Sequence, residues 1–491
     1  MISRIRIQNV PIVGVLVRRA ARGSALLAAI LIGAHPAASQ SSAGSDNQQL
    51  GRSILKELIE TNTTHGSGNT TEAAQKMAAR FLGAGFPEGD VQVVGPREKN
   101  RNLVVRYRSR SGSSETPILF IAHLDVVEAR REDWSVDPFV LLEKDGYFYG
   151  RGTLDVKGGG ATLVAAFLRL RQEGWVPDRD LILALTAGEE AGADYNGVQW
   201  LIQNRKDVME AAYCLNVDAG GPEMRGGKVV SLDVQASEKV FQSFSWTVRN
   251  PGGHSSLPTK NNAIYHLAGA LSRWSQYDFP PRMTDVTRAY FERSAPLVGG
   301  KLGDDMRAVT RARLDTAAAR RLSGISPFYN ALLRTTCVAT LLEGGHAENA
   351  LPQMARAVVN CRMLPGEDPK AIQREMVRVV ADTQVVIDTL AGSTPSPPSP
   401  LSPDVERILA GTARSMWGPI PIVPYMETGA TDGAWLRTAG MSVYGVTGVA
   451  YDPDDVRAHG RDERITVQGF NYGLEFAYRL MKAVSGGSAA P

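Results

Sequence analysis

Histidine and carboxylate side chains recur in this sequence where buried strands are expected to end. His123 and Asp125 close the apolar run FIAHLDVV, residues 120 to 127. Residues two apart on a strand point the same way, so Asp125 is predicted to reach the pocket of His123 or to hold its imidazole in one tautomer. An H-x-D pair by itself more often belongs to a hydrogen-bonded histidine with a solvated neighbour.

Four further stretches carry the same residue types. They are GRGTLDVKGG around Asp155, LTAGEE ending in Glu189 and Glu190, NVDAGG around Asp218, and RAHGRDE around His459. Taken singly, each residue is typical of a solvated loop or a helix cap. Because ligands bind beyond the carboxyl ends of strands in open parallel sheets, the five stretches together predict one shared site.

The predicted site suits two divalent cations. Three carboxylates and a bridging hydroxide carry four negative charges, which two such cations balance while both histidines stay neutral. Without cations, the three ionised carboxylates would repel one another. Histidine and carboxylate donors without thiolate favour zinc, with cobalt or manganese as substitutes. The expected ligands are His123, Asp155, Glu190, Asp218 and His459.

The paired glutamates are predicted to have separate roles. Adjacent side chains at a strand end diverge, so Glu190 can bind metal while Glu189 faces the bridging water. Glu189 is therefore expected to act as the general base and later to donate the proton to the leaving nitrogen.

The elements before residue 220 predict the sheet that positions these residues. Residues 117 to 122 and 181 to 186 are continuous apolar runs, as in strands covered on both faces. Helices are expected from 161 and over 198 to 208, followed by a strand at 213 to 217. This alternation predicts an α/β fold with a doubly wound, mostly parallel sheet.

A different pattern follows from residue 235. Phe244, Trp246 and Val248 alternate with polar residues, which is typical of a strand with one solvated face. The further expected elements are a helix at 262 to 275, strands at 336 to 342 and 355 to 363, a helix opening at Asp368 and Pro369, and a strand at 385 to 390. Residues 283 to 330 are helix-like and rich in arginine.

These patterns predict the domain organisation. Residues 45 to 234 form the first part of one domain, 235 to 394 an inserted α+β domain, and 404 to 485 the returning second part. The proline-rich stretch at 394 to 403 reads as the linker between them.

The chain begins like an exported protein. Five arginines precede the apolar run 25 to 34, and residues 1 to 38 resemble a bacterial secretory leader, which favours a periplasmic or secreted location. The run is too short to span a bilayer, although an uncleaved anchor is the alternative. Without those arginines, 49 basic residues face 51 acidic ones, so nothing favours a nucleic-acid partner.

The sequence contains three cysteines. Cys214, Cys337 and Cys361 are widely spaced within apolar stretches, and their number is odd. They are expected to be buried structural thiols rather than a disulfide framework.

Ordered motifs connect the chain with a known family from about residue 50 to 485. They are HLDVV, GRGTLDVKGG, GEE, VDAGG, PGGHSS, ENALP, NCRMLPG, TGATDG and AHG. In these motifs the chain resembles the dinuclear zinc hydrolases that include aminoacylase, acetylornithine deacetylase, succinyl-diaminopimelate desuccinylase, carnosine dipeptidase and glutamate carboxypeptidase G. The resemblance implies a zinc-peptidase-like catalytic domain with an inserted ferredoxin-like lid and dimerisation domain. The chain departs from the pattern at Gly188, where an acidic residue is usual.

The resemblance also implies a ligand arrangement. His123 and Asp218 would hold one metal and Glu190 and His459 the other, with Asp155 bridging both. Glu189 would be the general base, and Asp125 would orient His123.

Further residues enter through the same resemblance. His254 of the inserted domain would reach across a homodimer to stabilise the oxyanion. Arg362 and Asn349 would hold the carboxylate and carbonyl of the substrate, and Gly429 would also contact it. Arg362 lies on the polar face of the strand expected at 355 to 363, which suits a carboxylate clamp but equally a surface arginine.

Three functional hypotheses follow. The first is an exported metal-dependent hydrolase that cleaves the amide bond of a dipeptide, short peptide or N-acyl amino acid with a free carboxylate. The second keeps the metal centre but recognises a free amine, as an aminopeptidase does. The third is a non-catalytic binding protein, which is disfavoured because every ligand and the base are present.

Overall fold

A computed structural model describes residues 38–110, 113–192, 194–390, 392 and 394–489. The described residues from 45 onward form one compact unit, and the fold below is that of this unit. The predicted leader at 1–38 lies outside the described residues except for its last position. In the described part of the chain, no helix combines the length and apolar character needed to cross a membrane.

The larger part of the unit is built on a sheet whose centre is parallel. β3 (Ile118–His123) pairs in parallel with β7 (Leu181–Thr186) on one side and with β8 (Tyr213–Asn216) on the other. β18 (Val443–Gly445) continues the sheet parallel to β8, and β17 (Ile422–Glu427) pairs in parallel with β10 (Lys228–Glu238). The antiparallel pairings involve β1 (Val91–Val94), β2 (Asn102–Tyr107) and β9 (Gly221–Arg225), and also the contact of β10 with β18.

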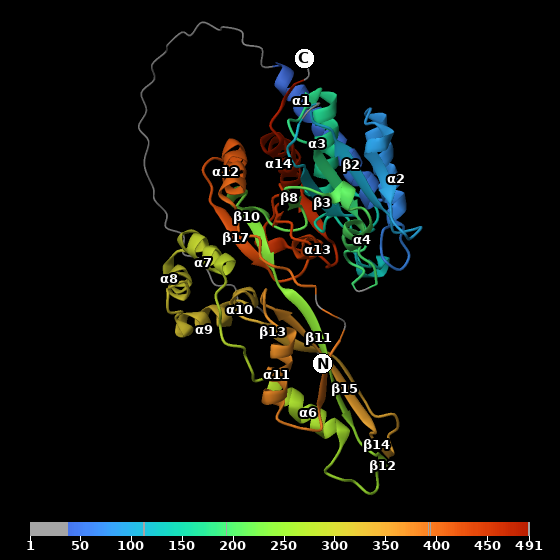
Figure 1. Cartoon of the computed structure of the whole chain (residues 1–491), viewed down its shortest axis with the longest axis vertical. Coiled ribbons are helices and arrows are strands. Elements are labelled where there is room, and N and C mark those ends of the chain that lie inside the picture. Colours follow the sequence, from blue (N-terminus) through green and yellow to red (C-terminus); the bar gives the residue numbers. More distant parts are fainter. Residues whose placement is uncertain (1–37, 111–112, 193, 391, 393, 490–491) are drawn as a thin grey trace. The chain divides into compact units, whose positions relative to one another are not determined.

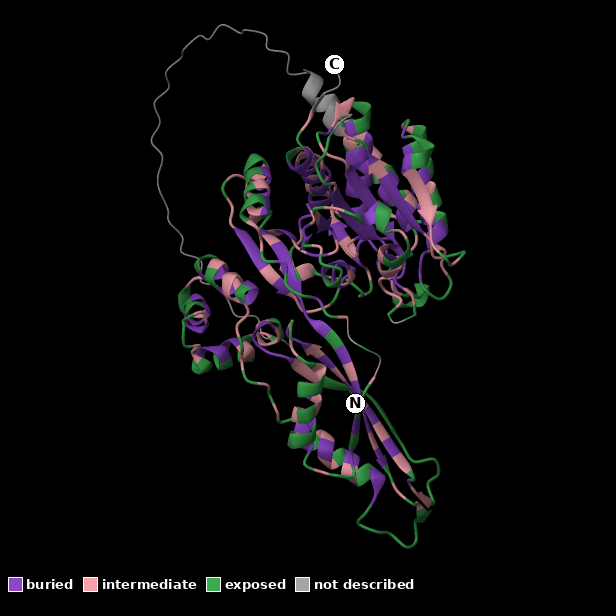
Figure 2. Ribbon diagram, in the orientation of Figure 1, coloured by how far each residue is buried: buried purple, intermediate pink, exposed green. Residues whose placement is uncertain are grey.

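Helices cover both faces of this sheet, as the continuous apolar strands predict (Figure 1). Phe120 packs into the core shared with α1 (Ala38–Ile59), α2 (Thr70–Gly83), α3 (Lys157–Gln172), α12 (Pro403–Trp417) and α14 (Val467–Ser485). Leu119 and Ile121 face the opposite core with α4 (Gly197–Asn204), α5 (Lys206–Met209) and α13 (Gly433–Thr438). β3 and β7 are buried at every residue, and the centre of the sheet is purple in Figure 2. The predicted doubly wound α/β fold is therefore confirmed.

The second sheet contains β11 (Val240–Arg249), β13 (Thr336–Gly344), β15 (Met354–Met363) and β16 (Val386–Thr389) in the order β13-β15-β11-β16. All its pairings are antiparallel, and α6 (Ala263–Trp274) and α11 (Pro369–Val380) complete the ferredoxin-like βαββαβ sequence. Trp246 and Trp274 pack in its core. The chain enters this sheet after Lys239, so the predicted border at 234/235 falls inside β10.

Residues 283 to 333 form four helices in the described chain, which agrees with the helical pattern. These are α7 (Asp285–Val298), α8 (Gly300–Val309), α9 (Thr316–Ile325) and α10 (Pro327–Leu333). They share a hydrophobic cluster that includes Ala236 of β10 and Met426 of β17. Although they lie within the predicted inserted domain, these helices therefore pack on the edge of the large sheet.

The proline-rich segment at 394–403 is not a free linker. Ser396 donates a hydrogen bond to Glu238, and the backbone N–H of Ser399 donates to the carbonyl of Ala236. Both serines are buried, so the segment is fixed along β10. Its proline-rich composition predicted a linker and did not reveal this packing.

Smaller pairings join distant segments. β4 (Leu142–Lys144), β5 (Tyr147–Tyr149) and β19 (Arg464–Thr466) form one small sheet, and β6 (Trp175–Val176) pairs with β20 (Ser488–Ala489). β12 (Gly253–His254) pairs with β14 (Ala350–Leu351) at the end of the second sheet that is far from α13 (Figure 1).

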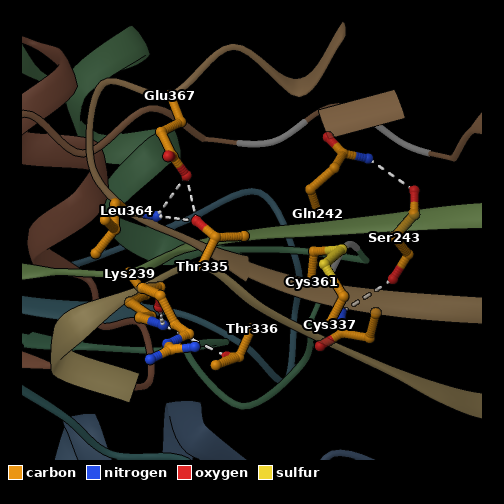
Figure 3. The surroundings of a disulfide bond; sticks show 11 residues. Lys239, Gln242, Ser243, Thr335, Thr336, Cys337, Cys361, Leu364 and Glu367 are labelled. Carbon is orange, nitrogen blue, oxygen red and sulfur yellow. Dashed lines mark hydrogen bonds between the residues drawn. A yellow bond between two sulfur atoms is a disulfide. The ribbon is translucent and has the colours of Figure 1, made fainter. Parts of the chain in front are cut away.

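The prediction of three thiols is wrong for two of the cysteines. Cys337 of β13 and Cys361 of β15 form a disulfide (Figure 3), whereas Cys214 is a buried free thiol as expected. The two bonded residues are direct partners in the antiparallel register of β13 and β15. A 24-residue sequence separation does not reveal that register, which explains the error.

Removal of this disulfide is expected to lower the stability of the protein. The Cys337→Ser, Cys361→Ser double variant should lose about 3 kcal/mol of unfolding free energy, because the unfolded chain gains loop entropy. Urea denaturation measures the change. Reducing agent should shift the wild-type midpoint and leave that of the double variant in place, and equal midpoints for wild type and variant would contradict the prediction.

Candidate metal centre and substrate cavity

The first half of the site lies at the end of β3. The Nε2 atom of His123 is 3.1 Å from Oδ1 of Asp155 and 3.4 Å from Oδ1 of Asp218. Asp218 follows β8, the neighbour of β3, while Asp155 precedes α3 at a cis Asp155–Val156 peptide bond. The parallel pairing of β3 and β8 therefore brings His123 and Asp218 together as the sequence predicted, and the loop before α3 adds Asp155.

The second half uses the other oxygen of the same aspartate. The Nε2 atom of His459 is 3.1 Å from Oδ2 of Asp155 and 2.8 Å from Oε1 of Glu190. Asp155 therefore separates two donor pairs, one on each carboxylate oxygen. Donor atoms of His123, Asp155 and Glu190 all lie within 4.8 Å of one another, the spacing needed to hold a metal ion.

The orientation of His123 is fixed by backbone. Its Nδ1 atom lies 2.9 Å from the carbonyl oxygen of Asp125, which can only accept, so Nδ1 carries the proton. When the ring is neutral, as a metal ligand must be, the lone pair of Nε2 faces Asp155 and Asp218. The tautomer is thus set by the main chain of Asp125 and not by its carboxylate, which corrects the expected role of that side chain.

The carboxylate of Asp125 instead holds the segment that carries the glutamates. It accepts hydrogen bonds from the backbone N–H groups of Gly188, Glu189 and Glu190 at 2.7, 3.3 and 2.9 Å. Gly188 has φ of +87°, and a Cβ there would lie 2.5 Å from the carbonyl oxygen of Tyr195. The departure from the family pattern at residue 188 therefore has a local steric reason.

The carboxylates shift one another's proton affinity. Burial and the negative charge of Asp155 raise the pKa of Asp218 to about 7. The contact with His123 lowers this pKa but only partly offsets the rise. Burial and the charge of Asp218 also raise the pKa of Glu189 well above its usual range. Such a concentration of negative charge with two imidazoles fits bound divalent cations, which would stabilise the ionised carboxylates.

The pKa values of the two histidines are raised as well, by their carboxylate neighbours. Hydrogen bonds to Asp155 and Glu190 raise the pKa of His459 to about 10. Burial lowers the pKa of His123, but Asp218 and Asp155 outweigh it and hold that pKa well above its ordinary value. Both rings therefore sit in a strongly electronegative environment, the field that a cation would also experience.

Glu463 supports the site and was missed by the sequence reasoning. It is fully buried and accepts hydrogen bonds from the backbone N–H groups of Gly152, Leu154 and Asp155 at 3.1, 2.8 and 3.0 Å. Arg151 pairs with it at 2.6 Å. Glu463 follows His459 by four residues in RAHGRDE, but an acidic residue beside an arginine in a loop gave no signal of burial.

A cavity of about 1490 Å³ adjoins the donor cluster, and Arg362 lines it from the second sheet. The guanidinium carbon of Arg362 lies 4.9 Å from the ring centroid of Phe241, another lining residue. Burial lowers the pKa of Arg362, and the negative charge of Glu189 opposes that shift. The predicted residues that line this cavity are Asp155, Glu189, Glu190, Asp218, Arg362, Gly429 and His459.

Two predicted residues lie elsewhere. His254 is exposed on β12, where its Nδ1 atom accepts hydrogen bonds from the backbone and hydroxyl of Ser256. Asn349 lies beside it, with its carbonyl accepting from Ser255. Neither lines the cavity, so within the described residues of one chain the structure does not bring them to the predicted metal ligands.

The chain is similar in sequence and in fold to known proteins. Residues 119–483 match the sequence profile described as Peptidase family M20/M25/M40. The human N-fatty-acyl-amino acid synthase/hydrolase PM20D1 is 30% identical over 389 residues, which cover 76% of this chain and 75% of that protein. A probable carboxypeptidase S-like 2 of Dictyostelium discoideum is 28% identical over 78% of this chain and 74% of its own length.

A solved structure has the same fold. The M20 family metallo-carboxypeptidase Sso-CP2 from Sulfolobus solfataricus superposes with a TM-score of 0.63 over 88% of this chain and 98% of its own, at 16% identity.

Proposed function

Because the chain belongs to peptidase family M20/M25/M40, a family of peptidases and amidohydrolases, we propose that it hydrolyses the amide bond of dipeptides, short peptides or N-acyl amino acids that bear a free carboxylate. The observation that carries this proposal is the pairing of donors around both oxygens of Asp155, in one cavity with Glu189 and Arg362. The names of two relatives, a probable carboxypeptidase S-like protein and an N-fatty-acyl-amino acid synthase/hydrolase, support the same substrate class.

Two divalent cations, zinc in our proposal, would be held by the two donor pairs. His123 and Asp218 would hold one and Glu190 and His459 the other, with one oxygen of Asp155 for each. When bound, such cations supply Lewis acidity to the scissile carbonyl and lower the pKa of water. Cobalt or manganese would suit the same nitrogen and oxygen donors.

Glu189 would move the proton. Its carboxylate lines the cavity beside the donor cluster, and Asp125 holds its backbone N–H. In this position Glu189 can accept a proton from the attacking water at a carboxylate oxygen and deliver it to the leaving nitrogen. The raised pKa of Glu189 suits a group that must hold the proton between these two steps.

Arg362 would bind the free carboxylate of the substrate. Arg362→Ala should reduce kcat/KM about 10- to 100-fold for an N-acetyl amino acid, because a charge-assisted hydrogen bond is lost. The corresponding C-terminal amide should be much less affected, and Arg356→Ala, on the same strand but outside the cavity lining, should change neither. Equal losses on the acid and the amide would remove the carboxylate clamp.

A substrate screen tests the proposed activity as a whole. Purified protein with added zinc is assayed on N-acyl amino acids, blocked dipeptides and free dipeptides, before and after chelation. We expect hydrolysis of N-blocked substrates that ends on chelation and returns with metal. Hydrolysis of N-free substrates alone would favour an aminopeptidase, and binding without any turnover would favour a non-catalytic relative.

His254 and Asn349 would act across a homodimer. β13 is the edge of the second sheet, and its Val338, Leu341 and Leu342 are 62, 61 and 69% exposed. An open apolar edge of this kind favours pairing with a second copy. Residues placed outside the cavity of their own chain could then complete that of the partner, with His254 stabilising the oxyanion and Asn349 the substrate carbonyl.

Subunit complementation tests this arrangement. His254→Ala and Glu189→Gln homodimers should each be inactive, while a mixture of exchanged subunits should recover about one quarter of wild-type activity, because half the dimers carry one intact composite site. Tandem affinity tags isolate the mixed dimers for assay. No recovery in verified mixed dimers would place His254 and Glu189 in separate sites.

We also propose a periplasmic or secreted location. The leader-like residues 1–38 and the Cys337–Cys361 disulfide support it, since disulfides persist in oxidising compartments. N-terminal sequencing of the protein recovered from the periplasm would give the processing site.

A further inference from the structure

The helices α7–α10 form one wall of the cavity. None of the predicted metal ligands, nor Glu189, lies on these helices. They are firmly attached, because their own core includes Ala236 of β10 and Met426 of β17. Arg293 of α7 also pairs with Glu406 of α12 and donates to the carbonyl of Ile422. These contacts fix the position of the four helices on the large sheet.

Each of the four helices contributes an apolar or aromatic side chain to the cavity lining. These residues, called the helical wall below, are Tyr290, Leu302, Ile325, Phe328 and Tyr329. The rings of Tyr290 and Phe328 pack edge to face with centroids 5.8 Å apart. Ile325 is 59% and Phe328 36% exposed, so substantial apolar surface faces the cavity and remains available to a ligand.

Charged groups near this wall are already engaged by other groups of the protein, including Lys239, whose ammonium donates to the carbonyl of Arg334. Glu223 and Arg225 line the cavity from β9 and are paired at 2.5 Å. Behind them, Tyr451 donates a hydrogen bond to Asp233 at 2.9 Å. This end of the cavity therefore offers no free ionic partner among these groups, in contrast to the metal ligands and Arg362, and it favours an uncharged substrate group.

The size of the cavity leaves room for such a group. At about 1490 Å³ it exceeds the roughly 300 to 1,000 Å³ of common small-molecule sites. A dipeptide or N-acetyl amino acid held between the metal ligands and Arg362 would leave the space beside the helical wall unfilled. Burial of apolar substrate against Ile325 and Phe328 would remove both surfaces from water.

We propose that the helical wall is a subsite for a large apolar group of the substrate, either the acyl chain or the side chain of the residue that carries the carboxylate. The inference rests on the proposed function, because it assigns the wall to the same hydrolytic cavity. It gives residues 283 to 333 a role in substrate selection.

Two substrate series distinguish the two sources of the apolar group. N-acyl glycines from acetyl to dodecanoyl vary the acyl chain, and N-acetyl amino acids from glycine to phenylalanine vary the side chain. We expect kcat/KM of the wild type to rise along one series. In the Ile325→Gln, Phe328→Ser variant, the ratio of kcat/KM for the largest to the smallest member should fall about 10- to 100-fold, the effect of losing this burial.

Leu297→Gln is the matched control, because Leu297 is 48% exposed on α7 but does not line the cavity. It should leave the size dependence unchanged. Equal losses on all members of both series, or an unaltered size dependence in the double variant, would overturn the proposal.

Binding separates this inference from the proposed activity. N-dodecanoylglycine and N-acetylphenylalanine are titrated calorimetrically into the metal-loaded Glu189→Gln protein, with and without the two wall substitutions. If the wild type hydrolyses none of these amides but the wall substitutions still weaken binding of the larger ligand, the proposed function fails and the subsite stands. If turnover is found and binding is insensitive to the wall, only the subsite fails.

Discussion

Glu189→Gln is expected to lower kcat by about three orders of magnitude while the protein keeps its full metal content. The substitution preserves the shape of the side chain and removes the oxygen that accepts the proton, and general acid–base catalysis contributes about 10²- to 10⁴-fold. Glu189 is not one of the donors grouped around Asp155, so the metal ligands stay complete. Stopped-time assays and elemental analysis of the same preparation measure both quantities.

Glu190→Gln provides the contrast for this prediction. Glu190 lies 2.8 Å from His459 and is held by the same aspartate, Asp125, through its backbone N–H. Its substitution should lower the metal content together with activity, because an anionic donor becomes neutral. If Glu189→Gln also loses metal, or keeps near wild-type kcat, Glu189 is not the base.

Asp155→Asn is expected to abolish activity and to remove both metal ions. Its two oxygens each lie 3.1 Å from a different histidine, so both donor pairs depend on this one carboxylate. Asp218→Asn removes a donor from the His123 side alone and should leave about one metal equivalent. Elemental analysis after dialysis against a weak chelator distinguishes these stoichiometries.

A structural control accompanies this comparison. Glu463 fixes the backbone of Asp155 without facing the cavity, so Glu463→Gln should weaken metal affinity but leave the stoichiometry at saturating metal unchanged. Retention of two equivalents by Asp155→Asn would show that Asp155 is not shared between the two sites.

The strongly patterned elements could be predicted from the sequence. β7 has the predicted bounds Leu181–Thr186, since an apolar run between loops defines a buried strand. In α11, Asp368 caps the helix, and Ile372, Met376 and Val380 form its buried face as expected. Periodicity and capping are local properties, so one segment contains all the information that they require.

Pairings between distant segments could not be predicted in the same way. The disulfide depends on which residues of β13 and β15 lie opposite each other, and neither strand specifies this alone. The helices α7–α10 were recognised as helical, but their packing against β17 follows from tertiary contacts. The buried serines at 396 and 399 likewise gave no signal within a proline-rich stretch.

In the site, too, some features could be predicted from the sequence and others could not. His123 ends β3, while Glu190 and Asp218 follow β7 and β8, so the parallel topology itself brings these three to one edge of the sheet. Asp155 and His459 reach them from the loops before α3 and β19. The carboxylate of Asp125 binds backbone N–H groups of residues 188–190, a contact across two strands that spacing did not reveal. His254 lies outside the cavity of its own chain, and its catalytic role stays a prediction about the dimer.

Anomalous diffraction from crystals grown with zinc is the most direct test of the central claim that two cations are held on either side of Asp155. We predict two zinc peaks, one beside His123 and Asp218 and one beside Glu190 and His459, with the carboxylate of Asp155 between them. A single peak, or zinc bound only away from these side chains, would contradict the account.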